Sequence, residues 1–297
     1  MASEFEMKNL GGLKYFLGIE VARSNQGIFL SQRKYILDLL SKVGLLECKP
    51  VDTSIVQNHK FGIYPDQKLA DKGKYQRLVG KLIYLSHTRP DIAYAVGVVS
   101  QFMHCPSEEH MEAVTRILKY LKSSPGKGLI FSKNGNLKVK GYTDADWAGN
   151  CLDRKSTSGY FTFVGGNLVT WRSKKQNVVA LSSAESEFRG MAKGLCELLW
   201  LKKLLTEIGF APKSEMSLFC VNKAAINISQ NPVQHDKTKH VEVDRHFIKH
   251  NLEMKTIQFS FVKSENQLAD ILTKAVSSKE FHSSLVKLCI RDPYAST

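Results

Sequence analysis

Two acidic stretches, one patterned as a buried strand and one at the start of a long helix, constrain this chain most. The first carries Asp144 and Asp146, which fall on one face of an extended strand. The second carries Glu185 and Glu187 in the first turn of a helix whose leucines continue at helical spacing. Carboxylates at the end of a core strand are costly to bury unless a cation compensates them. The pattern therefore predicts that a strand acid and a helix acid converge on a divalent metal.

The charge balance of the chain narrows its choice of partner. The 297 residues include 42 Lys and Arg against 28 Asp and Glu, and this net charge of +14 favours a polyanion such as nucleic acid. No apolar run reaches the roughly 18 residues of a membrane span, and the N-terminus lacks the pattern of a signal peptide. We therefore expect a soluble intracellular protein, cytoplasmic or nuclear, with no membrane partner. The six cysteines form no Cys-x-x-Cys pair, so we expect reduced thiols that mostly fill the core.

The first part of the chain predicts a hairpin followed by helices. Apolar residues over 15–30 predict two strands joined by a Ser-Asn-Gln-Gly turn, and Ser31 is a plausible N-cap for a helix that Gly44 ends. Residues 49–74 are polar and predict a linker. Apolar stripes at helical spacing over 75–123 predict two or three further helices.

From residue 129 onward the pattern predicts a mixed sheet flanked by helices. The expected elements are the acidic strand, a hairpin about Gly165-Gly166-Asn167, a helix over 183–209, strands over 216–221 and 257–262, and helical stretches over 223–230, 239–251 and 266–274. The tail 278–297 shows only a short amphipathic piece around Leu285.

Four sequence strings follow one another in a fixed order along the chain. They are Tyr-Thr-Asp-Ala-Asp-Trp-Ala at 142–148, Arg-Lys-Ser-Thr-Ser-Gly-Tyr at 154–160, Ser-Ser-Ala-Glu-Ser-Glu-Phe at 182–188 and Gln-Leu-Ala-Asp-Ile-Leu-Thr-Lys at 267–274. Together they resemble the ribonuclease H domain of Pol polyproteins from copia-type long-terminal-repeat retrotransposons. The resemblance implies an α+β or α/β fold, ribonuclease H-like, with a mixed five-stranded sheet and flanking helices.

The sequence before these strings resembles the preceding parts of the same polyproteins. Residues 5–21 are similar to the end of a reverse transcriptase palm, but the chain contains no Asp-Asp pair of a polymerase site, so we expect no polymerase activity. The resemblance implies four divisions: 1–62, the palm end and a thumb-like segment with the hairpin; 63–128, a helical connection-like region; 129–275, the ribonuclease H-like domain; and 276–297, a C-terminal tail.

The resemblance also assigns the acids. Ribonuclease H chemistry uses carboxylates around two Mg²⁺ (or Mn²⁺) ions roughly 4 Å apart. Residue by residue, it implies Asp144, Glu187 and Asp270 as the catalytic and metal-binding acids. Glu185 is the runner-up for the helix acid, because only one of two residues spaced i, i+2 can face the metals. Asp146 is a possible auxiliary acid, and a surface role is equally open.

One expected acid is absent. The family pattern Cys-Asp-Asn reads Cys-Val-Asn here, so Val221 stands where a carboxylate would bind the metal. Loss of such an electrostatic element lowers turnover by at least roughly 10²- to 10³-fold. We therefore expect a folded ribonuclease H-like protein whose ancestral activity on RNA–DNA hybrids is impaired. The alternative is a non-catalytic module that binds nucleic acid or protein.

A basic stretch near residue 240 is the predicted nucleic-acid interface. Its histidines lack a Cys partner and a His-Glu-x-x-His order, which argues against zinc. We expect a face that contacts phosphates, although a plain solvated helix fits nearly as well. The predicted partners are an RNA–DNA hybrid or other nucleic acid, and other parts of a reverse transcriptase. The residues of this face are Lys237, Lys239, His240, Arg245, His246 and Lys249.

Overall fold

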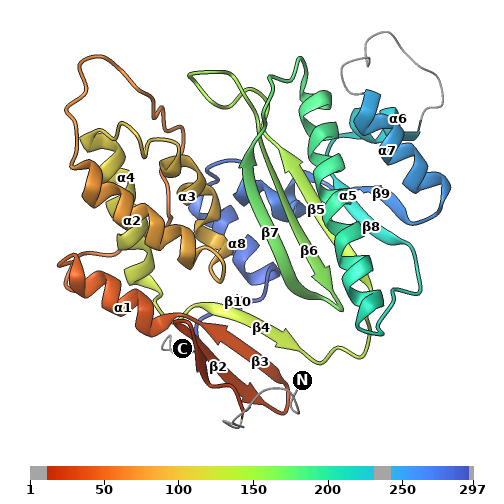
Figure 1. Cartoon of the computed structure of the whole chain (residues 1–297), viewed down its shortest axis with the longest axis horizontal. Coiled ribbons are helices and arrows are strands. Elements are labelled where there is room, and N and C mark those ends of the chain that lie inside the picture. Colours follow the sequence, from red (N-terminus) through yellow and green to blue (C-terminus); the bar gives the residue numbers. More distant parts are fainter. Residues whose placement is uncertain (1–11, 231–241, 294–297) are drawn as a thin grey trace, which may run out of the picture.

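Two β-sheets and the helices that pack on them make up the structure, a computed structural model that describes residues 12–230 and 242–293 (Figure 1). The first sheet is antiparallel, in the order β1-β2-β3-β4-β10. Its strands are β1 (Tyr15–Phe16), β2 (Ile19–Ser24), β3 (Gly27–Ser31), β4 (Gly128–Ser132) and β10 (Ile290–Arg291). The predicted N-terminal hairpin is therefore confirmed. Gly27 lies against β4 so closely that a Cβ there would meet the Phe131 carbonyl oxygen at 2.0 Å.

Four α-helices follow the hairpin and precede or flank β4. Ser31 is the last residue of β3, so the predicted N-cap was wrong, and Gln32 takes that position instead. Asp71 caps the second helix through Lys74, and Ser107 forms a capping box with His110 at the fourth. The helices are α1 (Arg33–Lys42), α2 (Lys72–Leu85), α3 (Ala93–Ser100) and α4 (Glu108–Ser123), with the 3₁₀ turn η1 (Pro90–Ile92) before α3.

The second sheet has the order β7-β6-β5-β8-β9. Strand β6 is antiparallel to both of its neighbours, β7 and β5, whereas β8 and β9 run parallel to β5. This arrangement confirms the predicted mixed five-stranded sheet. Gly165 and Gly166 both have positive φ and make the two-residue hairpin turn between β6 and β7. The strands are β5 (Val139–Ala145), β6 (Thr157–Val164), β7 (Asn167–Lys175), β8 (Met216–Cys220) and β9 (Ile257–Phe261).

Helices cover both faces of the second sheet. Helix α5 (Ser183–Glu207) crosses one face, with α6 (Lys223–Gln230) and α7 (Glu242–Glu253) beside it, and Phe188, Leu195 and Leu218 belong to this core (Figure 1). The opposite face contributes Phe161, Phe163 and Leu168 to a second core shared with α1 to α4. The sheet is therefore enclosed between two helical layers.

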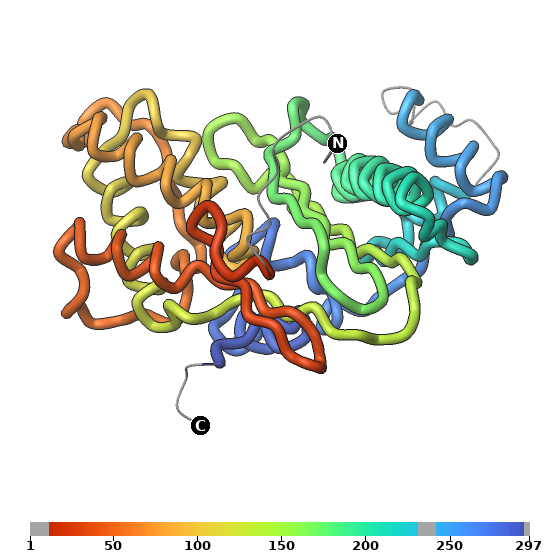
Figure 2. Tube along the Cα trace, turned by 60° about the horizontal axis from the view of Figure 1, so that its bottom comes forward, coloured from red at the N-terminus to blue at the C-terminus, as the bar shows by residue number. Residues whose placement is uncertain are grey.

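The C-terminal segment returns to the first sheet. Helix α8 (Ser278–Lys287) buries Phe281 and Leu285, and β10 pairs with β4 (Figure 2). The predicted boundary at 128/129 falls inside β4, which pairs with β3 rather than with the second sheet. The predicted helical piece 266–274 consists of two 3₁₀ turns, η3 (Ser264–Asn266) and η4 (Leu268–Leu272).

Two further expectations concern the membrane and the thiols. Within the described ranges, no helix has both the length and the apolar composition to cross a bilayer. All six cysteines are free, as expected, but the expectation that they fill the core was wrong. Only Cys220 is buried, and the four exposed thiols are those of Cys105, Cys151, Cys196 and Cys289.

Candidate active site

Asp144 lies at the centre of the second sheet, one residue before the end of β5. Asp144 as a whole residue is 2% exposed. The Thr273 hydroxyl donates a hydrogen bond to Oδ2 of Asp144, and Nζ of Lys274 lies 3.8 Å from the same oxygen. The carboxylate is thus buried with a hydroxyl donor and a cation beside it.

Glu187 reaches the same point from α5. Ser182 begins this helix by accepting a hydrogen bond from the Glu185 backbone N–H, and Glu187 sits buried one turn later. Burial raises the pKa of Glu187 to about 9. The second-largest cause of this rise is the charge of the Asp144 carboxylate, with which Glu187 shares a hydrogen bond. Glu187 therefore carries a proton near neutral pH and bonds Asp144. Oε2 of Glu187 also lies 3.8 Å from Sγ of the buried Cys220 at the end of β8.

Asp270 arrives on η4, which Gln267 ties to β5 by donating from Nε2 to the Thr143 carbonyl oxygen at 2.9 Å. Burial raises the pKa of Asp270 to about 7, and the negative charge of the Asp144 carboxylate is the second-largest cause of this rise. Nζ of Lys274 lies 3.0 Å from Oδ1 of Asp270. The structure therefore brings together the three acids that the sequence predicted, Asp144, Glu187 and Asp270.

Lys274 is the member of this cluster that sequence reasoning missed. Its ammonium group contacts both Asp144 and Asp270 and so neutralises part of the negative charge. The available signal was its spacing, four residues after Asp270, since an i, i+4 pair faces one side of a helical turn.

The two runner-up acids occupy different surroundings. Glu185 forms an ion pair with Arg189 at 3.0 Å and accepts a hydrogen bond from the Leu181 backbone N–H at 2.8 Å, so its carboxylate serves its own helix. Asp146 follows β5 and accepts a hydrogen bond from the Thr157 backbone N–H. Burial raises the pKa of Asp146 to about 6, and the nearby Asp144 adds to the rise. Asp146 thus lies at the margin of the cluster.

Val221 comes directly after β8. Tyr142 and Phe219 are the last residue pair between β5 and β8, so Val221 lies just beyond the paired strands, at the end of β5 that carries Asp144. A valine offers no ligand at this position.

The donors of this cluster suit a hard divalent cation in type, because all three are carboxylates. In arrangement they are less suited, since Lys274 already lies against two of them. Within residues 12–230 and 242–293, no group of three or more His, Cys, Asp or Glu side chains is poised to hold a metal ion. The cluster therefore provides ligands for a cation without a preformed metal cage.

Comparison with known proteins identifies the family. The family description "Reverse transcriptase (RNA-dependent DNA polymerase)" matches residues 1–57. The retrovirus-related Pol polyprotein from transposon RE1 of Arabidopsis thaliana is 41% identical over 288 residues, 97% of this chain and 20% of that polyprotein. An uncharacterized mitochondrial protein of the same plant is 40% identical over 200 residues, 67% of this chain and 83% of that protein. This chain belongs to the Pol polyproteins of copia-type transposons.

The copia-type Pol chain spans about a fifth of the length of the transposon polyproteins that it matches. Among solved structures, the foamy viral protease-reverse transcriptase in complex with RNA/DNA hybrid has a TM-score of 0.47 and 14% sequence identity, covering 88% of this chain and 30% of that one.

The predicted nucleic-acid face of this Pol chain is only partly described. Lys237, Lys239 and His240 lie outside the described residues. Arg245, His246 and Lys249 lie on α7, beside α5 (Figure 1). Two of these make i, i+4 pairs along their own helix: His246 with Glu242 at 3.8 Å and Lys249 with Glu253 at 3.7 Å. The phosphate-binding role of this face stays a prediction.

Proposed function

We propose that the chain is the ribonuclease H-like part of a copia-type Pol polyprotein, ancestrally hydrolysing the RNA strand of RNA–DNA hybrids and impaired in this copy. One observation supports the proposal: Asp144 lies close enough to raise the pKa of both Glu187 and Asp270, while Val221 directly follows β8, the strand that pairs with β5 in parallel. These three acids are the expected catalytic residues, and Val221 stands in place of the fourth carboxylate of the set.

The residues of the site have separate tasks in this proposal. A bound divalent cation would activate water and neutralise the scissile phosphate. Asp144 and Asp270 would hold the cation, and Glu187 would join them after losing the proton that it shares with Asp144. Without a fourth carboxylate, the set fits one Mg²⁺ or Mn²⁺ ion better than the pair that the chemistry requires.

A cleavage assay with the Val221→Asp variant tests the proposal. On a labelled RNA–DNA hybrid with Mg²⁺, we expect Val221→Asp to raise the cleavage rate by roughly 10²-fold or more. Val221→Asn is the matched control, because it adds a side chain of the same shape without the charge. Brisk cleavage by the unmodified chain that is abolished by Asp144→Asn would overturn the impairment.

A second candidate function is a non-catalytic module that binds nucleic acid. The contacts of Lys274 favour it, because an internal ammonium group stabilises the acids in the absence of any cation. This reading predicts that the chain binds the hybrid at moderate salt and that Val221→Asp leaves cleavage undetectable. The two candidates therefore give opposite results in the same assay.

A further inference from the structure

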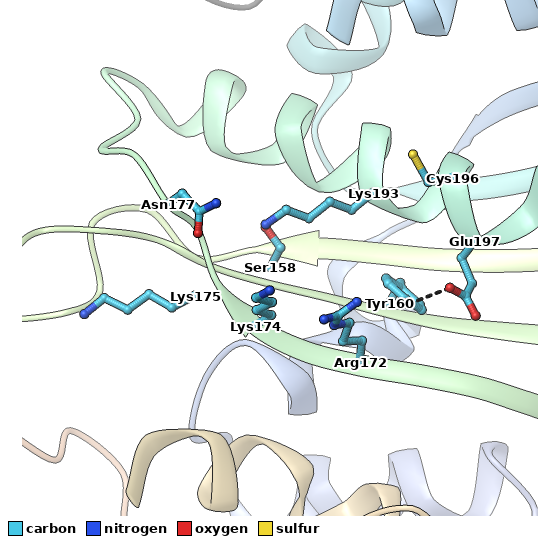
Figure 3. Close-up of a pocket in the computed structure, with 9 residues that line it drawn as sticks. All are labelled: Ser158, Tyr160, Arg172, Lys174, Lys175, Asn177, Lys193, Cys196 and Glu197. Carbon is cyan, nitrogen blue, oxygen red and sulfur yellow. Dashed lines mark hydrogen bonds between the residues drawn. The ribbon is translucent and has the colours of Figure 1, made fainter. Parts of the chain in front are cut away.

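A cavity of about 260 Å³ lies between α5 and the strands β6 and β7 (Figure 3). This volume is several times the roughly 30 Å³ that a water molecule occupies in the liquid. Its walls carry basic side chains from two consecutive elements, β7 and α5. Arg172 and Lys174 come from β7, and Lys193 comes from α5.

These three cations have little compensation. Over residues 12–230 and 242–293, none of Arg172, Lys174 and Lys193 makes an ion pair within 4.0 Å. Burial lowers the pKa of Lys193, and the like charges of Lys174 and Arg172 lower it further, while Asp244 opposes this. Such a cluster is relieved when an anion enters.

One acid, Glu197, also lines the cavity. Glu197 accepts a hydrogen bond from the Tyr160 hydroxyl at 2.8 Å, which Figure 3 shows as the dashed line. Lys193 extends from α5 toward Ser158, whose hydroxyl is a further possible donor to an anion. The cavity thus presents two ammonium groups, a guanidinium and a hydroxyl around one space, against the single carboxylate of Glu197.

We propose that this cavity binds a backbone phosphate of the nucleic-acid strand that passes the acid cluster. The inference rests on the proposed function, which places the strand at Asp144. Ammonium and guanidinium groups are the donors that phosphates prefer in proteins. The cavity and the acids are held in fixed relation, because Ser158 pairs with Ala145, the neighbour of Asp144.

The spacing suits a strand that contacts both places. Lys193 follows Glu187 by six residues on α5, which is a rise of about 9 Å. Nucleotides of one strand advance about 3.4 Å each along a duplex axis. A phosphate in the cavity would therefore lie about two to four nucleotides from the phosphate at the acids.

The chain supplies matched controls for each lysine. Lys175 follows Lys174 on β7 and also lines the cavity, but its charge is already compensated, because its Nζ pairs with Asp153 at 2.9 Å and points away from Lys193 in Figure 3. Lys203 lies on α5 like Lys193, is exposed, and pairs with Glu207 at 3.9 Å. The double variants Lys174→Gln/Lys193→Gln and Lys175→Gln/Lys203→Gln therefore remove equal charge from the same two elements.

The test measures binding of the whole chain to an RNA–DNA hybrid in Mg²⁺-free buffer, so that loss of cleavage does not affect it. Single phosphates along each strand are replaced in turn by neutral methylphosphonate. The unmodified chain should lose about tenfold in affinity at one or two adjacent positions, the size of one charge-assisted contact. Lys174→Gln/Lys193→Gln should be insensitive at those positions, whereas Lys175→Gln/Lys203→Gln should retain the loss. Equal sensitivity in all three proteins would overturn the proposal.

A second measurement separates a strand phosphate from a free one. The exposed thiol of Cys196 lines the cavity, so its alkylation rate reports occupancy, with Cys105 and Cys289 as references in the same chain. We expect protection of Cys196 by the hybrid and much less by millimolar inorganic phosphate. Protection by inorganic phosphate alone would assign the cavity to a free anion and overturn the strand proposal. If none of the proteins binds the hybrid, the proposed function itself fails. If all of them bind the hybrid with normal affinity but no single phosphate position matters, only the proposal for the cavity fails.

Discussion

Lys274 places a positive charge against two of the three acids, at 3.0 Å from Asp270 and 3.8 Å from Asp144. A cation that binds these carboxylates must compete with this ammonium group. We therefore expect Lys274→Gln to raise the affinity for Mg²⁺ by several-fold, seen as a larger Mg²⁺-induced rise in Tm than in the unmodified chain. Lys279→Gln, on the exposed side of α8, is the control. Equal Mg²⁺ responses in the two variants would contradict the competition.

Glu187 should make the stability of the metal-free protein depend on pH. Its folded pKa of about 9 lies above the ordinary value of 4.5, mainly because it is buried and then because Asp144 is close. The folded state therefore binds more protons than the unfolded state between these values, and stability falls as pH rises from about 5 to 9. Relative to Glu187→Gln, the unmodified chain should lose up to about 1.4 kcal/mol per pH unit in this window. Urea unfolding in EDTA at several pH values measures the difference, and parallel pH profiles would rule it out.

At the scale of elements, local signals predicted most of the fold. The Gly165–Gly166 turn and the alternation in β5 are both encoded within a few residues. Long-range pairings were not predictable in this way. Strand β4 joins β3 across about a hundred residues, and no local pattern tells it from a strand of the second sheet.

In the candidate site, too, the features encoded locally were predictable and the long-range contacts were not. The acids of the site were predictable from the strand and helix patterns and from the family resemblance, because carboxylates in such positions have few structural uses. The contact of Lys274 with Asp144 was not, since it depends on how η4 docks against β5. The cavity beside α5 was missed for the same reason, because its cations come from elements whose packing no single stretch of sequence reveals.

A buried ion pair at η1 is hydrogen-bonded to α4, and breaking this pair should destabilise the helical layer. Arg89 and Asp91 are fully buried side chains in contact at 2.7 Å, and the Tyr120 hydroxyl donates to the same Asp91 oxygen at 2.6 Å. Asp91→Asn would leave the Arg89 charge buried without its counter-ion, so we expect a loss of about 3–5 kcal/mol in unfolding free energy. Asp38→Asn, in the exposed Lys34–Asp38 pair, should cost less than about 0.5 kcal/mol. Urea denaturation measures the unfolding free energy of both variants. Similar losses would show that breaking the buried pair costs no more than breaking the exposed one.

At the scale of the whole molecule, one hydrophobic core crosses all four predicted divisions of the chain. Its buried members include Ile36, Tyr75, Phe161 and Phe281, one from each division. Trp171 of β7 also donates from Nε1 to the Ser86 carbonyl oxygen at 2.9 Å and so links the second sheet to the end of α2. The division at 276 therefore remains a prediction about ancestry, while in packing the C-terminal segment belongs to the shared core.

This shared core predicts that the chain unfolds as one cooperative unit and that α8 is needed for it. Leu285 is 2% exposed and Val286 is 69% exposed, so they are neighbours with opposite surroundings. Leu285→Ala should lower the unfolding free energy by about 2–5 kcal/mol, whereas Val286→Ala should stay within about 0.5 kcal/mol. Tryptophan fluorescence, in which Trp171 reports on the contact between the sheet and α2, and far-UV circular dichroism should give coincident urea transitions for all three proteins. If Leu285→Ala instead shifted the circular dichroism transition alone and left the fluorescence transition in place, the two parts would unfold separately, because a defect in α8 would then not reach the sheet.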